Sequence, residues 1–212
     1  MCDPMSIAMD TKSRRYEMST RADSTRASNL AIVEAAQAAI VARRSLDITL
    51  GMVAERSGLT VKTILRHFGN REALIDAAWS RMRQDVLAER EAPPGDPGQA
   101  LAVLIEHYER RGDVVLGLLG EEDGDRRARL ICDEGRHFHR DWVAQAFAGY
   151  LPSEGGARDR LIDALVVVTD VYSWKLLRRD RGLTVDDTHR CMQFMTDALL
   201  SAGTGSQGGA AQ

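Results

Sequence analysis

The sequence predicts an all-α fold, and three observations support this prediction. Apolar residues recur three and four positions apart along most of the 212 residues, which is the spacing of one helix face. No stretch alternates apolar and polar residues as a half-buried strand does. Apolar residue types supply 44% of the chain, which is enough to build a core. We therefore expect helices packed on helices, in one large domain or two small ones.

The first 24 residues of the chain show no regular spacing of apolar residues. Residues 1–24 are rich in Met, Ser and charged side chains, so we expect a disordered tail there. A helix is predicted over 27–44, where alanine is frequent and where Ile32, Ala36 and Ile40 share one face. This helix is expected to complete a three-helix bundle with the two short helices that follow it.

Two short capped helices are predicted between residues 49 and 72. Thr49 caps the first helix, and Gly58 ends it because glycine enters the left-handed region without steric cost. Thr60 caps the second helix. Together they form a helix-turn-helix pattern. The apolar positions of the two helices are Leu50, Val53 and Ala54, and then Ile64, Leu65 and Phe68.

Basic residues gather on the second short helix. Between residues 58 and 71 the chain carries Lys62, Arg66 and Arg71 and no Asp or Glu, although its net charge is −3. This balance indicates a surface that faces phosphates. Arg71 stands at the start of the next helix, where a cation opposes the macrodipole. A phosphate contact therefore fits Arg71 better than a structural role.

The rest of the chain is also helical by pattern. The stretch APPGDPG at 92–98 is rich in helix breakers, so the domain boundary is expected near it or within the long helix before it. Residues 161–177 are apolar on nearly every face and must be buried on several sides. Helical segments are expected at 71–91, 99–111, 113–119, 126–150, 157–181 and 184–202, before a glycine-rich tail.

Cysteine use and hydropathy exclude several classes of protein. Cys2, Cys132 and Cys191 are odd in number and widely spaced, which favours a reducing cytoplasm over a disulfide framework. Because no CxxC spacing occurs, we expect no metal site, and we expect no cofactor. No apolar run is long enough for a membrane span, and the N-terminus does not resemble a signal peptide. Ser173 and Cys132 lack a recognisable base, so we do not expect an enzyme.

Four segments carry a resemblance to a known family. They are IVEAA at 32–36, Thr49, VAERSGLTVKT at 53–63 and LRHFGNREAL at 65–74. With these segments, residues 26–78 resemble the DNA-binding domain of TetR-type transcriptional regulators. The stretch WKLLRRDRGLT at 174–184 is similar to the end of the family's ligand-binding domains.

Two positions depart from the family pattern. Leu65 stands where the family usually has a tyrosine whose hydroxyl contacts phosphate, so either that contact is lost or Leu65 belongs to the core. Arg44 and Ser45 stand where the family usually has a glycine after the first helix. The loop there is expected to bend differently, with Arg44 as a candidate phosphate contact.

The resemblance implies two domains and a homodimer. A helix-turn-helix DNA-binding domain would span 25–72, followed by a helical ligand-binding and dimerisation domain at 73–202 and a flexible tail at 203–212. The family dimerises through its last two long helices, which correspond here to 157–181 and 184–202. Val61, Lys62 and Thr63 would read bases, because they lie near the N-terminus of the recognition helix. The implied DNA-binding residues are Thr49, Thr60, Val61, Lys62, Thr63, Arg66, His67, Arg71 and Arg44.

The resemblance also implies a small-molecule effector of unknown identity, whose binding inside the second domain lowers the affinity for DNA. Asp170 is an acid within an apolar run, so it needs a ligand cation, a structural arginine or a group at the dimer interface as its partner. The aromatic candidates are more often plain core than pocket. The candidate lining residues are His107, Tyr108, Phe138, Trp142, Asp170 and Trp174.

Together these observations predict a ligand-responsive transcriptional repressor that binds a pseudo-palindromic operator in double-stranded DNA as a homodimer. The alternative is an all-helical protein-interaction adaptor that uses the helix-turn-helix only for packing. Salt-dependent binding to duplex DNA separates the two hypotheses, because only the first requires phosphate contacts.

Overall fold

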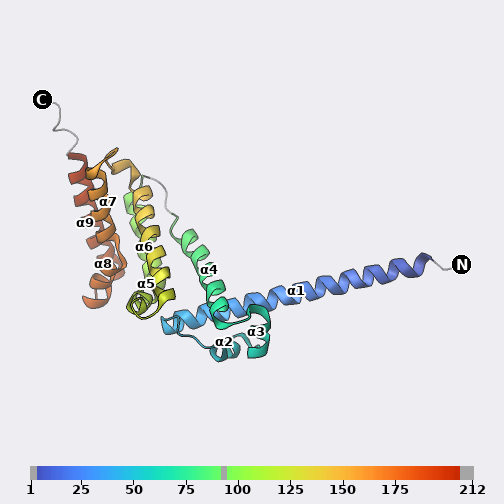
Figure 1. Ribbon diagram of the computed structural model, residues 1–212. Coiled ribbons are helices and arrows are strands. Elements are labelled where there is room, and N and C mark those ends of the chain that lie inside the picture. Colours follow the sequence, from blue (N-terminus) through green and yellow to red (C-terminus); the bar gives the residue numbers. More distant parts are fainter. Residues whose placement is uncertain (1–3, 92–94, 206–212) are drawn as a thin grey trace. The chain divides into compact units, whose positions relative to one another are not determined.

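The computed structural model describes residues 4–91 and 95–205, which form helices and turns with no strand among them (Figure 1). The all-α prediction is therefore confirmed for this part of the chain. The helices are α1 (Pro4–Arg43), α2 (Leu50–Ser57), α3 (Val61–Phe68), α4 (Arg71–Glu89), α5 (Pro97–Glu121), α6 (Arg126–Ala146), α7 (Gly156–Thr169), α8 (Val171–Lys175) and α9 (Val185–Gly205). A 3₁₀ turn spans Ala148–Tyr150, and a π-helical turn spans Leu176–Asp180.

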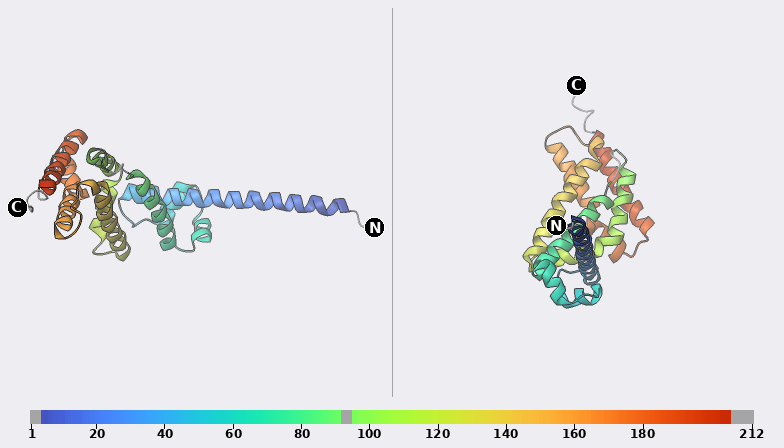
Figure 2. Two further views of the ribbon diagram at one scale, coloured as in Figure 1. Left: turned by 90° about the horizontal axis from the view of Figure 1, so that it is seen from above. Right: turned by 90° about the vertical axis from the view of Figure 1, so that its right-hand side faces the viewer.

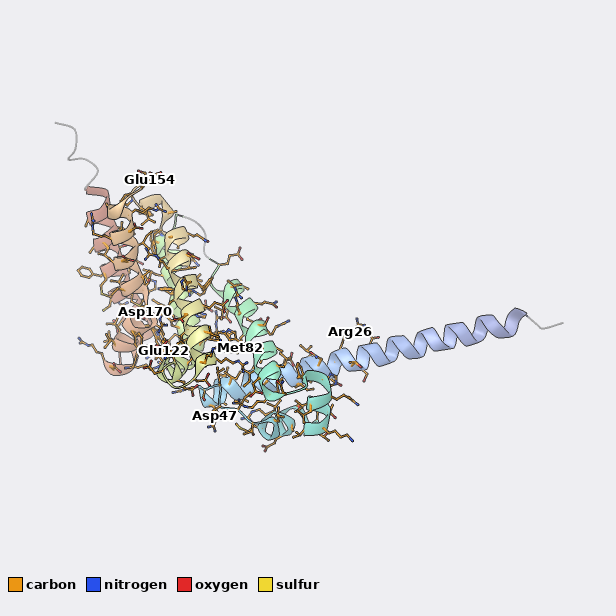
Figure 3. The ribbon with its side chains drawn as sticks, viewed as in Figure 1. Arg26, Asp47, Met82, Glu122, Glu154 and Asp170 are labelled. Atoms are coloured by element: carbon orange, nitrogen blue, oxygen red, sulfur yellow. The ribbon has the colours of Figure 1, made fainter. Side chains whose placement is uncertain are left out.

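The chain divides into two compact units. The first unit holds the residues up to Ala42 together with Asp47–Met82, and the second holds Arg43–Leu46 together with the residues from Arg83 onward. The resemblance placed the boundary between residues 72 and 73, and the breaker-rich stretch placed it near 92–98 or within the long helix before it. The chain divides inside that helix, α4, between Met82 and Arg83. Met82, the last residue of the first unit, lies inside this helix (Figure 3).

Helix α1 begins earlier than the sequence pattern predicted. It runs unbroken from Pro4, so the predicted disordered tail is helical from that residue on (Figure 2). The physical reason is the absence of Gly and Pro between Met5 and Arg43, which leaves nothing to interrupt the backbone ladder once it has formed. Within the predicted helix, Ile32, Ala36 and Ile40 are fully buried as expected.

The first unit builds its core from α1, the two short helices and the first half of α4. Ile64 of α3 and Leu74 of α4 are fully buried, as is Val53 of α2. The side chain of Gln37 donates from Nε2 to the carbonyl oxygen of Ala78 at 3.4 Å, which ties α1 to α4. The half of α4 that the sequence assigned to the second domain therefore belongs to this core.

The second unit is a bundle in which α5 packs against α6, α8 and α9, while α7 packs against α6 and α9 (Figure 1). Helix α5 is continuous, so the segments predicted at 99–111 and 113–119 are one helix. Helix α9 begins after Thr184, whose Oγ1 accepts the Asp187 N–H at 3.1 Å, and runs to Gly205. Residues 206–212 of the predicted tail lie outside the described residues. The centre of the bundle core includes Leu101, Leu104, Trp142, Phe147 and Trp174.

The predicted helix at 157–181 is broken at Asp170, at the junction of α7 and α8 (Figure 3). Asp170 has an extended backbone, and its Oδ1 accepts the Tyr172 N–H at 2.8 Å. Ser173 Oγ donates to the Val167 carbonyl oxygen at 2.6 Å. These two side chains form hydrogen bonds with nearby backbone groups, which replace the hydrogen bonds of a continuous helix. Helix α7 therefore ends here and α8 begins after Asp170.

Residues 161–177 are buried on several sides, because α7 packs against α6 and α9 and α8 packs against α5 and α9, but some of their apolar side chains stay exposed within the single chain. Val167 keeps 66% of its surface exposed, and Tyr172 and Leu176 are also exposed. These exposed apolar side chains lie on α7, α8 and the π-helical turn.

Candidate functional site

Two side chains and one glycine fix the backbone around α2 and α3. Thr49 Oγ1 accepts the Met52 N–H at 3.2 Å, and Thr60 Oγ1 accepts the Thr63 N–H at 3.1 Å. Gly58 follows α2 with φ 68°, in the left-handed region. The predicted caps and turn are therefore confirmed. They hold α3 at a fixed angle to α2 in a way that local sequence alone determines.

The exposed face of α3 combines basic and apolar side chains. Lys62 and Arg66 are exposed and lie one turn apart, and Val61 and Leu65 are exposed beside them. Because Leu65 is 39% exposed, it does not belong to the core. No acidic residue occurs in α3. Ile64 is the buried side chain that anchors the opposite face of the helix.

Two more of the predicted DNA-binding residues lie at the ends of α3. Thr63 is half-buried, and its hydroxyl lies 3.0 Å from that of Thr60, so part of its hydrogen-bonding capacity is used inside the helix. His67 is also half-buried, with its ring centroid 6.3 Å from that of Phe68. Both side chains therefore lie only partly at the exposed face of α3.

Arg71 has a structural role that the sequence argument had set aside. Its Nε donates to the Ile48 carbonyl oxygen at 2.6 Å, and its guanidinium lies 3.7 Å from Asp47 and 3.4 Å from Glu72. These contacts hold the loop between α1 and α2 against the start of α4. A cation at this helix N-terminus is therefore explained by the carbonyl and carboxylates around it.

Arg44 belongs to the second unit, whereas α3 belongs to the first. Its guanidinium lies 3.1 Å from Asp113, and its backbone adopts φ 53°. That conformation is left-handed and favours glycine, which is the residue the TetR family usually has near this position. The arginine therefore adopts this conformation at a steric cost.

The six predicted pocket residues separate into different environments within the second unit. Trp174 is fully buried, with Nε1 donating to Glu109 Oε1 at 2.8 Å, so it is core. Tyr108 lies beside it, 5.9 Å between ring centroids, and donates from Oη to the Thr169 carbonyl oxygen at 3.0 Å. Asp170 caps α8, a role outside the three partners considered for it, and burial raises its pKa.

The remaining candidates surround a cluster that the sequence did not reveal. Phe138 and Trp142 each face the guanidinium of Arg90, whose Cζ lies 4.9 and 4.8 Å from their ring centroids. Arg90 is buried, and its Nη2 donates to His139 Nδ1 at 2.7 Å. Sequence reasoning missed Arg90 because a basic residue next to a helix C-terminus ordinarily indicates only a favourable contact with the macrodipole.

A second, partly buried group of charged and polar side chains involves Glu89, which precedes Arg90 in the chain. Glu89 Oε2 accepts from Arg111 Nε at 2.8 Å and lies 3.1 Å from His107 Nδ1. Chiefly through the hydrogen bond from Arg111, the pKa of Glu89 falls to about 2. Burial, reinforced by the charge of Arg90, lowers the pKa of His107 to about 4 and that of His139 to about 3. Both histidines are therefore neutral at pH 7.

These pKa values predict acid destabilisation of the second unit. Below pH 6.5 these two histidines bind protons in the unfolded chain but stay neutral in the folded chain. The free energy of unfolding therefore falls from about pH 6.5 towards pH 3. Each histidine contributes a slope of up to about 1.4 kcal/mol per pH unit. Urea unfolding at several pH values between 7 and 4 measures this slope.

A matched pair of variants assigns the slope to the buried position. His139→Gln should flatten the pH dependence of the unfolding free energy. His137→Gln, at an exposed position of the same helix, should keep the wild-type slope. Identical slopes in both variants would show that His139 does not contribute.

Neither a metal site nor a membrane span is found in the described part of the chain. Within residues 4–91 and 95–205, no group of three or more His, Cys, Asp or Glu is placed to hold a metal ion. In that same part of the chain, no helix combines the length and apolar character needed to cross a bilayer. In the comparisons with known proteins, no family model matches the chain and no curated protein matches it.

Proposed function

We propose that the protein is a ligand-responsive transcriptional regulator of the TetR type, a repressor that binds duplex DNA through α3. The observation that supports this most is the exposed face of α3. It places Lys62 and Arg66 on one side of a helix that carries no acid and is capped by Thr60. An adaptor that used α2 and α3 only for packing would have no need of a basic, outward face on its second helix.

The chemistry of that face fits a helix lying in the major groove. Lys62 is near the N-terminus of α3, where it would donate to guanine O6 and N7. Val61 would pack its methyl groups on a thymine methyl, and Arg66, one turn later, would bind a phosphate. Thr49 also retains a role, because its Oγ1 accepts the Met52 N–H while its own hydroxyl proton stays available to a phosphate.

Two symmetric copies would double the short sequence that one helix reads. The exposed side chains of Val167, Tyr172, Leu176 and Phe194 support a homodimer through α7, α8 and α9. Large exposed apolar side chains on helices that pack against one another fit an interface better than a solvated face. In such a dimer, the two copies of α3 would lie about 34–36 Å apart, one turn of B-DNA, on a pseudo-palindrome.

Substitutions on α3 are expected to separate base reading from phosphate binding. Lys62→Ala should lower the affinity for the preferred operator by about tenfold to a hundredfold and relax the preference at one base pair. Arg66→Ala should weaken binding to operator and random duplexes alike. Selection of a random oligonucleotide pool with the purified protein, followed by titration of the selected and the scrambled duplex, measures both effects.

The control for this experiment is Arg56→Ala, which removes an arginine from α2. Its guanidinium donates to the Met52 carbonyl oxygen at 3.4 Å, and it is not among the residues proposed to contact DNA. A Lys62→Ala variant that lost affinity equally for operator and random DNA would remove Lys62 as a base reader.

A further inference from the structure

Arg90 is a buried cation that forms no ion pair in the described part of the chain. Only 6% of its surface is exposed, and no ion pair within residues 4–91 and 95–205 includes it. Its Nε is buried and has no hydrogen-bond partner in the described residues. Burying a charge is costly unless it is paired and hydrogen-bonded, so a site of this kind usually serves a purpose other than stability.

The surroundings orient the guanidinium without neutralising it. Trp142 and Phe138 offer ring faces at 4.8 and 4.9 Å, and His139 offers only a neutral nitrogen. The faces of aromatic rings attract a cation but return only part of the desolvation cost. Trp142 is itself fixed, because its Nε1 donates to the Arg90 carbonyl oxygen at 2.9 Å.

The nearby acids are engaged elsewhere. Both carboxylate oxygens of Glu89 accept from Arg111, at 2.7 and 2.8 Å, and Oε2 also lies beside His107. Asp170 uses its carboxylate to cap α8 through the Tyr172 N–H. Asp170 acts on Arg90 through its charge but forms no ion pair with it. The Nε–H of Arg90 is therefore left for a carboxylate that the described part of the chain does not itself bring into contact.

We propose that Arg90 anchors a small monocarboxylate with an apolar or aromatic body, and that such a molecule is the effector; its regulatory meaning rests on the proposed function. A guanidinium presents a planar fork that matches a carboxylate. A single buried positive charge balances one negative charge, which favours a carboxylate over a doubly charged phosphate. The rings of Phe138 and Trp142 suit an apolar body beside that carboxylate.

A hydrogen-bond chain leads from Arg90 to the end of α7. Because His139 Nδ1 accepts from Arg90, its Nε2 carries the proton and donates to Thr169 Oγ1 at 3.1 Å. The Thr169 hydroxyl in turn donates to the Leu165 carbonyl oxygen at 2.6 Å. A carboxylate that draws Nη2 away from His139 would release this chain at the last turn of α7, the helix that carries part of the proposed dimer surface.

The test uses the full-length protein without DNA. Benzoate, phenylacetate and hexanoate are each compared with the corresponding neutral amide, with the midpoint of thermal unfolding, Tm, as the readout. At a hundred times the dissociation constant, a bound carboxylate should raise Tm by about 5 °C or more. The amides lack the charge and should leave Tm unchanged.

Two variants connect the effect to the site. Arg90→Met should abolish the carboxylate shift and keep or raise the Tm of the free protein, because it removes a buried charge that has no anionic partner. Arg126→Gln, at an exposed position of α6, should keep the carboxylate shift. If Arg90→Met fails to fold, the carboxylate and amide pairs on the wild-type protein still decide the question.

If none of the three acids raises Tm more than its amide does, or if Arg90→Met keeps the shift, Arg90 is a structural arginine only. This failure is distinct from failure of the proposed function, which shows in DNA titrations. A protein that binds carboxylates but not duplex DNA would keep the Arg90 site and lose the regulator.

Discussion

Replacing Gly112 with alanine is expected to lower the free energy of unfolding of the second unit by about 2–3 kcal/mol, because the core there has no room. A Cβ at this position of α5 would lie 2.5 and 2.7 Å from ring atoms of Trp174. That ring cannot easily move, since Nε1 donates to Glu109 and the Arg179 guanidinium lies 4.4 Å from its centroid. The gain in helix propensity, about 1 kcal/mol, offsets only part of the strain.

Gly120, two turns later in the same helix, provides the control. A Cβ at Gly120 meets nothing within 4 Å, so Gly120→Ala should raise the unfolding free energy by about 0.5–1 kcal/mol through propensity alone. Urea denaturation of the two variants should therefore give changes of opposite sign. Stabilisation by both would mean that the Trp174 ring is free to shift.

Replacing Phe194 with aspartate is expected to dissociate the proposed homodimer and to lower operator affinity by more than about a hundredfold. Phe194 is 76% exposed on α9, and truncating a large aromatic anchor of an interface costs about 2–4 kcal/mol before any charge is buried. A monomer would also lose the second half-site, and with it the added affinity of two linked contacts. Analytical ultracentrifugation and operator titration measure the two effects.

Leu130→Asp is the matched substitution outside the proposed interface. Leu130 lies on α6 and is 58% exposed, so the same chemical change occurs at an apolar side chain of similar exposure. This variant should keep both the dimer and the operator affinity. A Phe194→Asp protein that remained dimeric would place the interface away from α9.

The sequence predicted well those parts of the fold that depend on contacts between residues close together in the chain. Thr49 and Thr60 cap α2 and α3 because each hydroxyl reaches an N–H three residues ahead. Gly58 supplies the left-handed turn between the two helices. In each case, the partner atoms lie within one helical turn, so the residue type and its position determine the contact.

Contacts between residues far apart in the chain could not be predicted from the sequence. Arg71 was expected to bind phosphate, yet its partner is the carbonyl of Ile48, 23 positions earlier. Arg90 and His139 are 49 positions apart, and only the packing of the helices in the second unit brings them together. The break at Asp170 was missed for a different reason, because the apolar pattern continues through it while the capping side chain interrupts the backbone.

The salt dependence of binding to a selected operator tests most directly whether this chain is a DNA-binding protein. The affinity is measured by titrating the duplex at several salt concentrations from about 50 to about 200 mM. With at least four phosphates neutralised by a dimer, we expect the association constant to fall by about a hundredfold over that range. An Arg66→Ala protein should show a shallower slope. An affinity that stays flat across the range would contradict binding of α3 to DNA and would favour a packing role for this helix.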